Sequence, residues 1–218
     1  MMRVSKTILL AAGILGLFSV LATGLVSVVH HGTRERIAEN QRQTLLHTLQ
    51  AVLPADSYDN DILKDAIEVE HPDLDAHRPV PVYRARRGGQ PVAAVLVPTA
   101  PDGYNGEIKL LVAIYKNGEL AGVRVLTHKE TPGLGDPIEE SKSDWVLRFS
   151  GLSLDNPPVM QWKVKRDGGA FDQFTGATIT PRAVVKAVRK ALSYFDLNKK
   201  ALFAEEAQAD VDPPAEAE

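Results

Sequence analysis

The spacing between hydrophobic residues changes from one segment of this chain to the next, and the longest apolar run lies near its beginning. Residues 7–29 contain no charged side chain. At about 1.5 Å per residue, a helix of this length reaches roughly 35 Å, which is enough to cross the hydrocarbon core of a bilayer. Because Arg3 and Lys6 precede the run and Arg34 and Arg36 follow it, the pattern predicts a membrane-spanning helix over residues 7–29.

A cleaved signal peptide is the alternative for the same segment. The apolar part of a signal peptide is usually about 7–15 residues long, and the small residues Ala22-Thr23-Gly24 lie inside this run rather than after it. An uncleaved anchor is therefore favoured. Its orientation stays open, because the basic residues on its two sides are nearly balanced.

The segment after the anchor keeps a helical period and then becomes irregular. Apolar residues recur at helical spacing over 33–53, which predicts a helix that continues from the anchor and stops before Pro54. A second, short helix is predicted over 61–69. Residues 30–80 are accordingly assigned to a helical connecting region.

From residue 81 the chain consists of short β-type runs separated by turn signals. Two hairpins are predicted, one over 82–97 with a Gly-Gly-Gln turn and one over 108–126 with Asn117-Gly118 at its tip. Asn-Gly is the stronger of the two signals, because a two-residue turn of this kind requires positive φ at both positions.

Three further elements are predicted before the C-terminus. Residues 136–149 are typical of a helix, with acidic residues in the first turns, and residues 161–166 alternate like a short strand. Residues 181–195 give the clearest helix signal, because at 100° per residue they form one apolar and one basic face. The apolar residues are Val184, Val185, Val188, Leu192 and Phe195. The basic residues, which we interpret as solvated, are Arg182, Lys186, Arg189 and Lys190.

These elements predict one compact α+β domain over residues 81–200, with antiparallel hairpins and flanking helices, behind a single N-terminal transmembrane helix. Composition changes this picture at the C-terminal end. Residues 201–218 carry six carboxylates and no basic side chain. Because the last ten residues also have no apolar face to bury, 201–218 is predicted to be a disordered acidic tail.

Charge and cysteine content exclude several classes of function. The net charge is −3, although the acidic tail conceals a net basic remainder. Nucleic-acid binders usually show a basic footprint, so no nucleic-acid partner is expected. The chain has no cysteine, which excludes a disulfide scaffold, a thiolate-bound metal or iron–sulfur cluster, and a cysteine nucleophile.

Common catalytic motifs are also missing from the sequence. There is no GxxxxGK[ST] phosphate loop, no GxSxG elbow and no HExxH zinc motif, and the six histidines are scattered. We therefore predict neither a protein-bound metal nor dedicated catalytic residues. Any redox role would need an organic cofactor.

Two loops rich in glycine and threonine remain as candidate sites. The first, 128–135 (HKETPGLG), fits either close approach to a flat ligand or a plain connection that needs its glycines sterically. The second, 172–181 (DQFTGATITP), leads into the last helix, with Thr180 as the expected N-cap and Pro181 as the first helical residue. A helix N-terminus favours an anion there, but the same pattern fits a helix that is merely capped.

The second loop resembles a known motif. Thr175-Gly176-Ala177-Thr178, preceded by Asp172, is similar to the D-x-x-[ST]-G-A-T flavinylation motif of FMN-binding domains. Together with HKETPGLG, the run TGATITPRAVVKAV and residues 103–108, it resembles the G subunit of the Rnf (Rsx) electron-transport complex over roughly residues 1–200. A related family is the C subunit of the sodium-pumping NADH:quinone reductase.

The resemblance implies a cofactor and the residues that bind it. In that family, FMN is attached through its phosphate to the last threonine of the motif, here Thr178, by a separate flavin transferase that uses FAD as donor. The other residues implied at the flavin site are Asp172, Thr175, Gly176, Ala177 and Thr180 from the second loop and Glu130, Thr131, Gly133 and Leu134 from the first.

Neighbouring residues have two interpretations each. His128 or Lys129 would either bias the charge near the flavin ring or form a solvated surface pair. Trp145, Trp162 and Phe174 would be either ring neighbours or core aromatics, and we interpret them as core.

The resemblance also implies a location and partners. Residues 1–6 would lie in the cytoplasm and the domain in the periplasm, on the bacterial inner membrane. The expected function is that of an electron carrier in a complex that couples NADH–ferredoxin redox chemistry to ion translocation, with the other membrane subunits and the transferase as partners. The alternatives are the quinone-reductase subunit, a non-redox periplasmic scaffold module and a free-standing flavin reductase.

Overall fold

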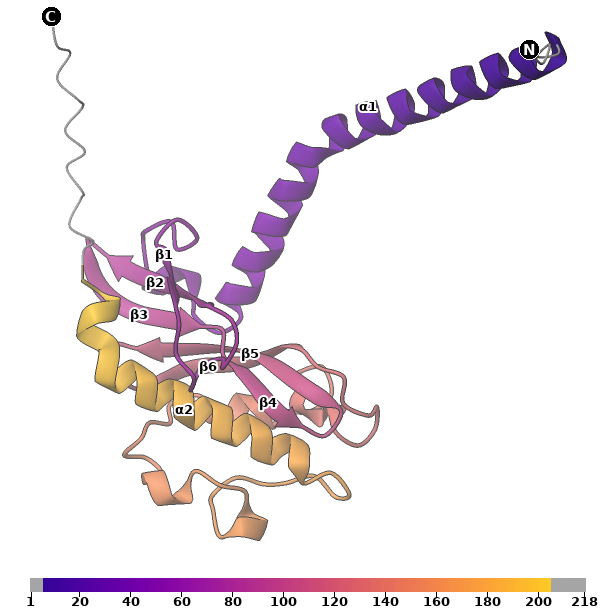
Figure 1. Ribbon diagram of the computed structural model, residues 1–218. Coiled ribbons are helices and arrows are strands. Elements are labelled where there is room, and N and C mark those ends of the chain that lie inside the picture. Colours follow the sequence, from indigo (N-terminus) through magenta and orange to yellow (C-terminus); the bar gives the residue numbers. More distant parts are fainter. Residues whose placement is uncertain (1–5, 205–218) are drawn as a thin grey trace, which may run out of the picture. The chain divides into compact units, whose positions relative to one another are not determined.

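The computed structural model describes residues 6–204, with side chains for 8–25, 39, 40 and 42–204. The chain divides into two compact units at the boundary between Thr48 and Leu49 (Figure 1), and each is described by itself. The predictions for residues 1–5 and for 205–218, which hold most of the expected acidic tail, lie outside the described residues.

The first unit contains all but the last two residues of the long helix α1, Lys6–Gln50. Its segment Ile8–Leu25 is long and apolar enough to cross a membrane, and its side chains are exposed. The helix therefore covers both the predicted anchor and most of the predicted juxtamembrane helix. It ends four residues before Pro54, and Val52 and Leu53 are buried in the turn that follows.

The second unit is built on a six-stranded antiparallel sheet. Its strands are β1 (Ala66–Val69), β2 (Val80–Arg87), β3 (Gln90–Leu96), β4 (Thr99–Gly103), β5 (Gly106–Tyr115) and β6 (Leu120–Thr127). The long strand β5 organises the sheet: β3 and β4 pair with successive halves of one edge, and β6 pairs with the opposite edge. This arrangement confirms the α+β class and both predicted hairpins.

The first hairpin turn forms at the predicted glycines, whereas the second differs from the predicted turn. Positive φ at both turn positions is found at Gly88 (54°) and Gly89 (76°), between β2 and β3. In the other hairpin only Gly118 has positive φ (95°), and Asn117 does not. The Asn117 side chain instead accepts the backbone N–H of Glu119 at 3.0 Å. The second turn is therefore a longer loop in which a single glycine is enough.

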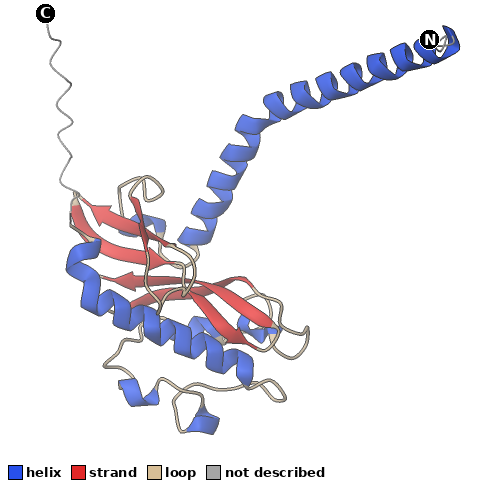
Figure 2. Ribbon diagram, in the orientation of Figure 1, coloured by secondary structure: helices blue, strands red, loops and turns tan. Residues whose placement is uncertain are grey.

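Helix α2, Ile179–Leu202, lies across one face of the sheet (Figure 2). All five residues of its predicted apolar face are buried, and they pack in the same core as residues of β2 to β6. The basic face is more than solvated, because three of its four side chains form ion pairs. These pairs are Arg182–Asp167, Lys186–Asp102 and Lys190–Asp73.

The short helix predicted over 61–69 is wrong. A turn occupies 61–65, and β1 follows it. Ile67 and Val69 alternate along β1 and lie opposite Val82 and Val80 of β2. Because the apolar residues of this segment stand at a spacing of two, pairing with a neighbouring strand prevailed over local helix propensity.

The helix predicted over 136–149 is also wrong, because only two 3₁₀ turns form there, Asp136–Ile138 and Val146–Phe149. The Ser143 hydroxyl donates to the carbonyl of Pro137 at 2.6 Å and accepts the N–H of Trp145 at 3.2 Å. Such hydrogen bonds from a side chain to the backbone compete with a helical ladder.

The strand predicted over 161–166 is replaced by two 3₁₀ turns, Val159–Gln161 and Lys165–Asp167, and a single bridge between Val164 and Phe171. The alternation of Trp162 and Val164 reflects burial in the core, since both side chains are almost inaccessible. The core interpretation of Trp145 and Trp162 is confirmed, and half-buried Phe174 packs on Trp145.

The compact unit extends beyond the predicted range of 81–200 at both ends. Its buried core already includes Leu49, Ile62 and Leu74 before the second strand. At the other end α2 continues to Leu202, which is 2% exposed. The connecting region is therefore helical only in its first part, and residues 201–204 belong to the domain rather than to the tail.

Candidate functional site

A surface pocket of about 150 Å³ lies where α2 begins. Three segments that are distant in the sequence form its wall: the turn between β4 and β5, the loop that follows β6, and the loop that leads into α2. Its lining residues are Tyr104, Glu130, Thr131, Leu134, Gly135, Gly176, Ala177, Thr178, Ile179 and Thr180. The two candidate loops thus meet in one place.

Some of the residues that were expected at the flavin site line the pocket, and others do not. Seven of them line it: Glu130, Thr131, Leu134, Gly176, Ala177, Thr178 and Thr180. Asp172, Thr175 and Gly133 lie outside the lining. Tyr104, Gly135 and Ile179 were not predicted as site residues. Tyr104 lies in the segment 103–108 that carries part of the family resemblance, and its aromatic ring could have indicated a ligand contact.

Glu130 connects the three segments. The residue is only 5% exposed, and its carboxylate accepts the hydroxyl of Thr180 and, at 3.0 Å, the backbone N–H of Asn105. No cationic side chain forms an ion pair with it within residues 6–204. Because a buried carboxylate without an ion-pair partner is costly when it loses a hydrogen bond, both neutral donors have to stay in place. Glu130 therefore fixes the relative positions of the segments that carry them.

Thr180 has a different role from the one predicted. Helix α2 begins at Ile179, so Thr178 occupies the N-cap position and Thr180 lies within the first turn. The Thr180 side chain is 1% exposed and donates to Glu130. The expectation that Thr180 caps the helix is therefore wrong, because its hydroxyl serves the buried carboxylate instead.

Steric and backbone constraints explain the two glycines of the loop 128–135. A Cβ on Gly135 would lie 2.8 Å from Cβ of Glu130 and 2.9 Å from the hydroxyl oxygen of Thr180, so a side chain does not fit. Gly133 has φ of 77° and donates its N–H to Asp136 at 2.6 Å. Of the two interpretations of these glycines, the steric one is supported, although the loop still forms one wall of the pocket.

The two basic residues at the start of this loop, His128 and Lys129, lie outside the pocket. The ring of His128 contacts the carboxylate of Glu139 at 2.7 Å. This hydrogen bond is the main cause that lowers the pKa of Glu139.

Asp172 anchors the second loop from outside the pocket. Lys165 and Arg148 form ion pairs with its two oxygens at 2.5 and 2.6 Å, and the indole N–H of Trp145 donates to its carbonyl at 2.8 Å. The hydrogen bond from Lys165 is the main cause that lowers the pKa of Asp172, with the charges of Lys165 and Arg148 adding to it. Asp172 therefore holds the loop in shape.

The residues between Asp172 and α2 form a tight turn. Gly176 has φ of 81°, and the N–H of Ala177 donates to the carbonyl of Phe174 at 3.2 Å. A Cβ on Gly176 would meet the Leu134 side chain at 3.7 Å, which shows how closely the two loops approach. A left-handed conformation of this kind favours glycine.

Thr178 stands at the start of α2 without capping it. Its backbone is helical, with φ of −81° and ψ of −26°, and no side chain caps the helix. The side chain is half-buried and lines the pocket. Its hydroxyl oxygen is therefore not occupied by the hydrogen bond that threonine usually makes at this position.

Known families cover both units of the chain. Residues 103–193 match the FMN-binding domain family, and residues 1–52 match the RnfG N-terminal region. Among curated relatives, the G subunit of the ion-translocating oxidoreductase complex of Shewanella loihica is 48% identical over 207 residues, which cover 94% of this chain and 98% of the relative. The protein of the same name from Pseudomonas aeruginosa (strain UCBPP-PA14) is 51% identical over 205 residues, covering 94% and 96%.

The chain belongs to the family of G subunits of ion-translocating oxidoreductase complexes. The resemblance stated from the sequence motifs is confirmed. All residues that line the pocket lie inside the matched FMN-binding domain. Because these relatives are named as G subunits, the quinone-reductase family is not favoured for this chain.

Proposed function

We propose that this chain is a membrane-anchored flavoprotein subunit with FMN bound covalently to Thr178 through a phosphodiester. It passes electrons within an ion-translocating complex that couples redox chemistry between NADH and ferredoxin to ion transport. The observation that carries the proposal is the pocket at the start of α2, which brings both sequence motifs to one threonine with an uncapped helix behind it.

The residues of the pocket fit an FMN group. Tyr104, Leu134 and Ile179 are 66%, 46% and 43% exposed, and all three line the same pocket. Large apolar side chains gathered at one exposed place are a common sign of a ligand-binding surface. They suit a flat aromatic ring, while the start of α2 suits the phosphate, because a helix N-terminus favours negative charge.

Each part of the site has a separate task in this proposal. When bound, the flavin supplies reversible electron transfer, because the redox chemistry belongs to the cofactor and the protein binds and orients it. Thr178 holds the phosphate covalently, which prevents loss of the cofactor to the surrounding medium. Glu130 and Thr180 hold the pocket walls together, and Asp172 fixes the turn that presents Thr178.

Attachment of the cofactor balances as a simple group transfer. The Thr178 oxygen forms a bond to the flavin-side phosphorus of FAD, and the bond between that phosphorus and the bridging oxygen of the diphosphate breaks. AMP leaves, and the hydroxyl proton is released. A flavin transferase is the partner that this step requires.

The proposed location combines the anchor, which provides one membrane span, with the family resemblance, which implies the orientation of that span. Residues 7–29 would span the bacterial inner membrane once, with residues 1–6 in the cytoplasm and the FMN-binding domain in the periplasm. The helix Lys6–Gln50 supports a single span by its length and apolar composition. Partners would be the other membrane subunits of the complex.

Covalent flavin is tested on a denaturing gel. The protein is produced with and without a flavin transferase, denatured and viewed under ultraviolet light. Wild type should show a fluorescent band only with the transferase, and Thr178→Ala should abolish it. Thr175→Ala is the matched control, because it removes an exposed hydroxyl from the same motif outside the pocket lining.

The gel also separates the alternatives. Fluorescence that survives in Thr178→Ala but disappears in Thr175→Ala would move the attachment point to Thr175. Wild type that stays dark in the presence of an active transferase and FAD would contradict the proposal and favour a scaffold module without a redox cofactor.

A further inference from the structure

The side chain of Arg166 faces the proposed attachment point. Its Nη1 atom lies 3.4 Å from the hydroxyl oxygen of Thr178. Within the described range 6–204, no carboxylate lies at ion-pair distance from this guanidinium. Arg166 was not among the residues predicted from the sequence motifs, because it precedes them and belongs to no recognised pattern.

Three other basic side chains around the loop are already paired. Lys165 and Arg148 contact Asp172, and Arg182 contacts Asp167 through two hydrogen bonds at 2.6 and 2.9 Å. Arg166 therefore differs from these neighbours in having a neutral hydroxyl, and not a carboxylate, as its side-chain contact.

Hydrogen bonds fold the backbone around Arg166 back on itself. The N–H of Arg166 donates to the side-chain oxygen of Gln173 at 3.2 Å, and the N–H of Lys165 donates to the carbonyl of Phe171 at 2.7 Å. The turn between them needs glycine, since a Cβ on Gly169 would overlap the carbonyl oxygen of Lys163.

A phosphate on Thr178 would change the electrostatic situation of Arg166. A phosphodiester carries one negative charge and two non-bridging oxygens, and it would be attached to the very oxygen that Nη1 faces. Arginine is always charged, and its planar donors match phosphate oxygens better than the single ammonium of lysine does. An arginine without a carboxylate at this place completes the positive environment that the helix N-terminus begins.

We propose that Arg166 is the phosphate-binding residue of the site, where its guanidinium donates hydrogen bonds to the phosphodiester on Thr178. This inference rests on the proposed function. The same phosphate chemistry occurs in the diphosphate of FAD during attachment, so the experiment has to distinguish the finished diester from the donor.

The test compares Arg166→Gln, Arg166→Lys and Lys163→Gln with wild type. Lys163 is the matched control, because it is an exposed cation of the same segment that lines a different groove, between Met160 and Arg182. Two quantities are measured: the initial rate of covalent flavin incorporation from FAD by the transferase, and the ³¹P resonance of the finished flavoprotein. Thermal unfolding of each flavin-free variant shows whether its fold is intact.

We expect Arg166→Gln to move the ³¹P resonance away from its wild-type position and to slow incorporation by about two- to fivefold at low salt, the range for an exposed charge interaction. Both differences should shrink as the ionic strength rises, because salt screens exposed charges. Arg166→Lys should lie between wild type and Arg166→Gln. Lys163→Gln should match wild type.

Three results would overturn the inference or the function beneath it. A flavinylated Arg166→Gln protein with the wild-type ³¹P resonance and rate overturns the inference while the proposed function stands. A slower rate with an unchanged resonance also overturns it, since Arg166 would then contact only the phosphates of FAD. Wild type that takes up no flavin contradicts the proposed function itself.

Discussion

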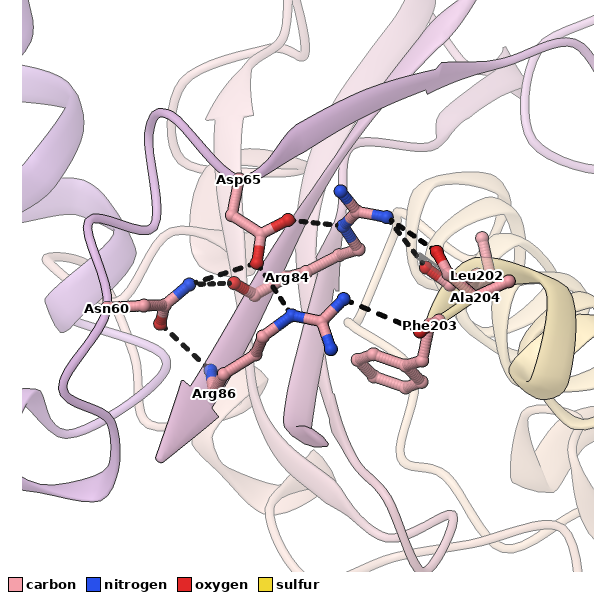
Figure 3. A network of polar contacts seen from close by, with 7 residues as sticks. All are labelled: Asn60, Asp65, Arg84, Arg86, Leu202, Phe203 and Ala204. Atoms are coloured by element: carbon pink, nitrogen blue, oxygen red, sulfur yellow. Dashed lines mark hydrogen bonds and ion pairs between the residues drawn. The ribbon is translucent and has the colours of Figure 1, made fainter. Parts of the chain in front are cut away.

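The two ends of helix α2 are completed in different ways, although they belong to one element of 24 residues. At the C-terminal end, Arg84 donates to the carbonyls of Leu202 and Ala204 and Arg86 donates to that of Phe203, each at 3.4 Å (Figure 3). At the N-terminal end no side chain caps the helix.

Charge balance follows the same division. Asp65 forms ion pairs with Arg84 and Arg86 at 2.5 and 2.8 Å, and the remaining positive charge faces the helix C-terminus, where cations are favoured. At the other end Arg166 has no carboxylate partner within residues 6–204. The C-terminal end is thus complete within the protein, whereas the N-terminal end would be completed, in the function that we propose, by the phosphate on Thr178.

The comparison predicts that changes at the C-terminal end affect stability most. Asp65→Asn leaves two arginines, 13% and 14% exposed, without their charge partner. We expect a loss of about 2–4 kcal/mol in the free energy of unfolding, measured with urea, because an uncompensated charge remains largely buried. The folded variant should still take up flavin at the wild-type rate.

The matched control for Asp65 is Asp196→Asn. Asp196 pairs with Lys199 on the exposed side of the same helix, at 3.1 Å. This exposed pair should be worth less than about 0.5 kcal/mol. Equal effects of the two substitutions would contradict the structural role assigned to the Asp65 cluster.

Thr180→Val should have the next largest effect. It removes the hydroxyl that donates to buried Glu130 and leaves a carboxylate oxygen without this donor. We expect a loss of about 1–3 kcal/mol in unfolding experiments on the flavin-free protein, together with slower flavin incorporation. Thr180→Ser keeps the hydroxyl and should recover most of both; no difference between the two variants would argue against the Glu130 contact.

Asp172→Asn should have a smaller effect that depends on pH. The pKa of Asp172 is lowered in the folded protein from its ordinary value of 3.8, chiefly by Lys165. Its contribution is therefore present above pH 3.8 and is lost as the pH falls through the lower folded-state pKa. We expect less than about 1 kcal/mol between wild type and variant at about pH 7, since the pairs are exposed, and a smaller difference at about pH 3. A difference that grew on acidification would contradict this assignment.

Thr178→Ala should change stability least. Because Thr178 makes no capping hydrogen bond, the flavin-free variant should unfold within about 0.5 kcal/mol of wild type. Its flavin incorporation should nevertheless be lost completely. A large loss of stability would mean that the threonine belongs to the fold, as Asp65 does, and not to the cofactor.

Sequence signals predicted the parts of the fold whose determinants are local. The apolar run of α1, the glycine-containing turns and the 3.6-residue period of α2 each act within a few residues. The secondary structure of residues 136–173 was not predicted, because Ser143 and the indoles of Trp145 and Trp162 hold that region through hydrogen bonds to backbone atoms. Such contacts leave no periodic pattern in the sequence.

The candidate site shows the same limit. Both loops were recognised, because glycine, threonine and the helix start leave a readable motif. The contact of Thr180 with Glu130 joins residues fifty positions apart, so the nearer role of an N-cap was assigned instead. Tyr104 and Arg166 reach the pocket and Thr178 only through tertiary folding.

The central claim, that Thr178 carries the flavin, is tested most directly by mass spectrometry of protein purified from cells that contain a flavin transferase. The intact mass should exceed that of the polypeptide by one FMN less one water. After proteolysis, the added mass should map to Thr178. An unmodified Thr178, or the same mass on Thr175, would contradict the account.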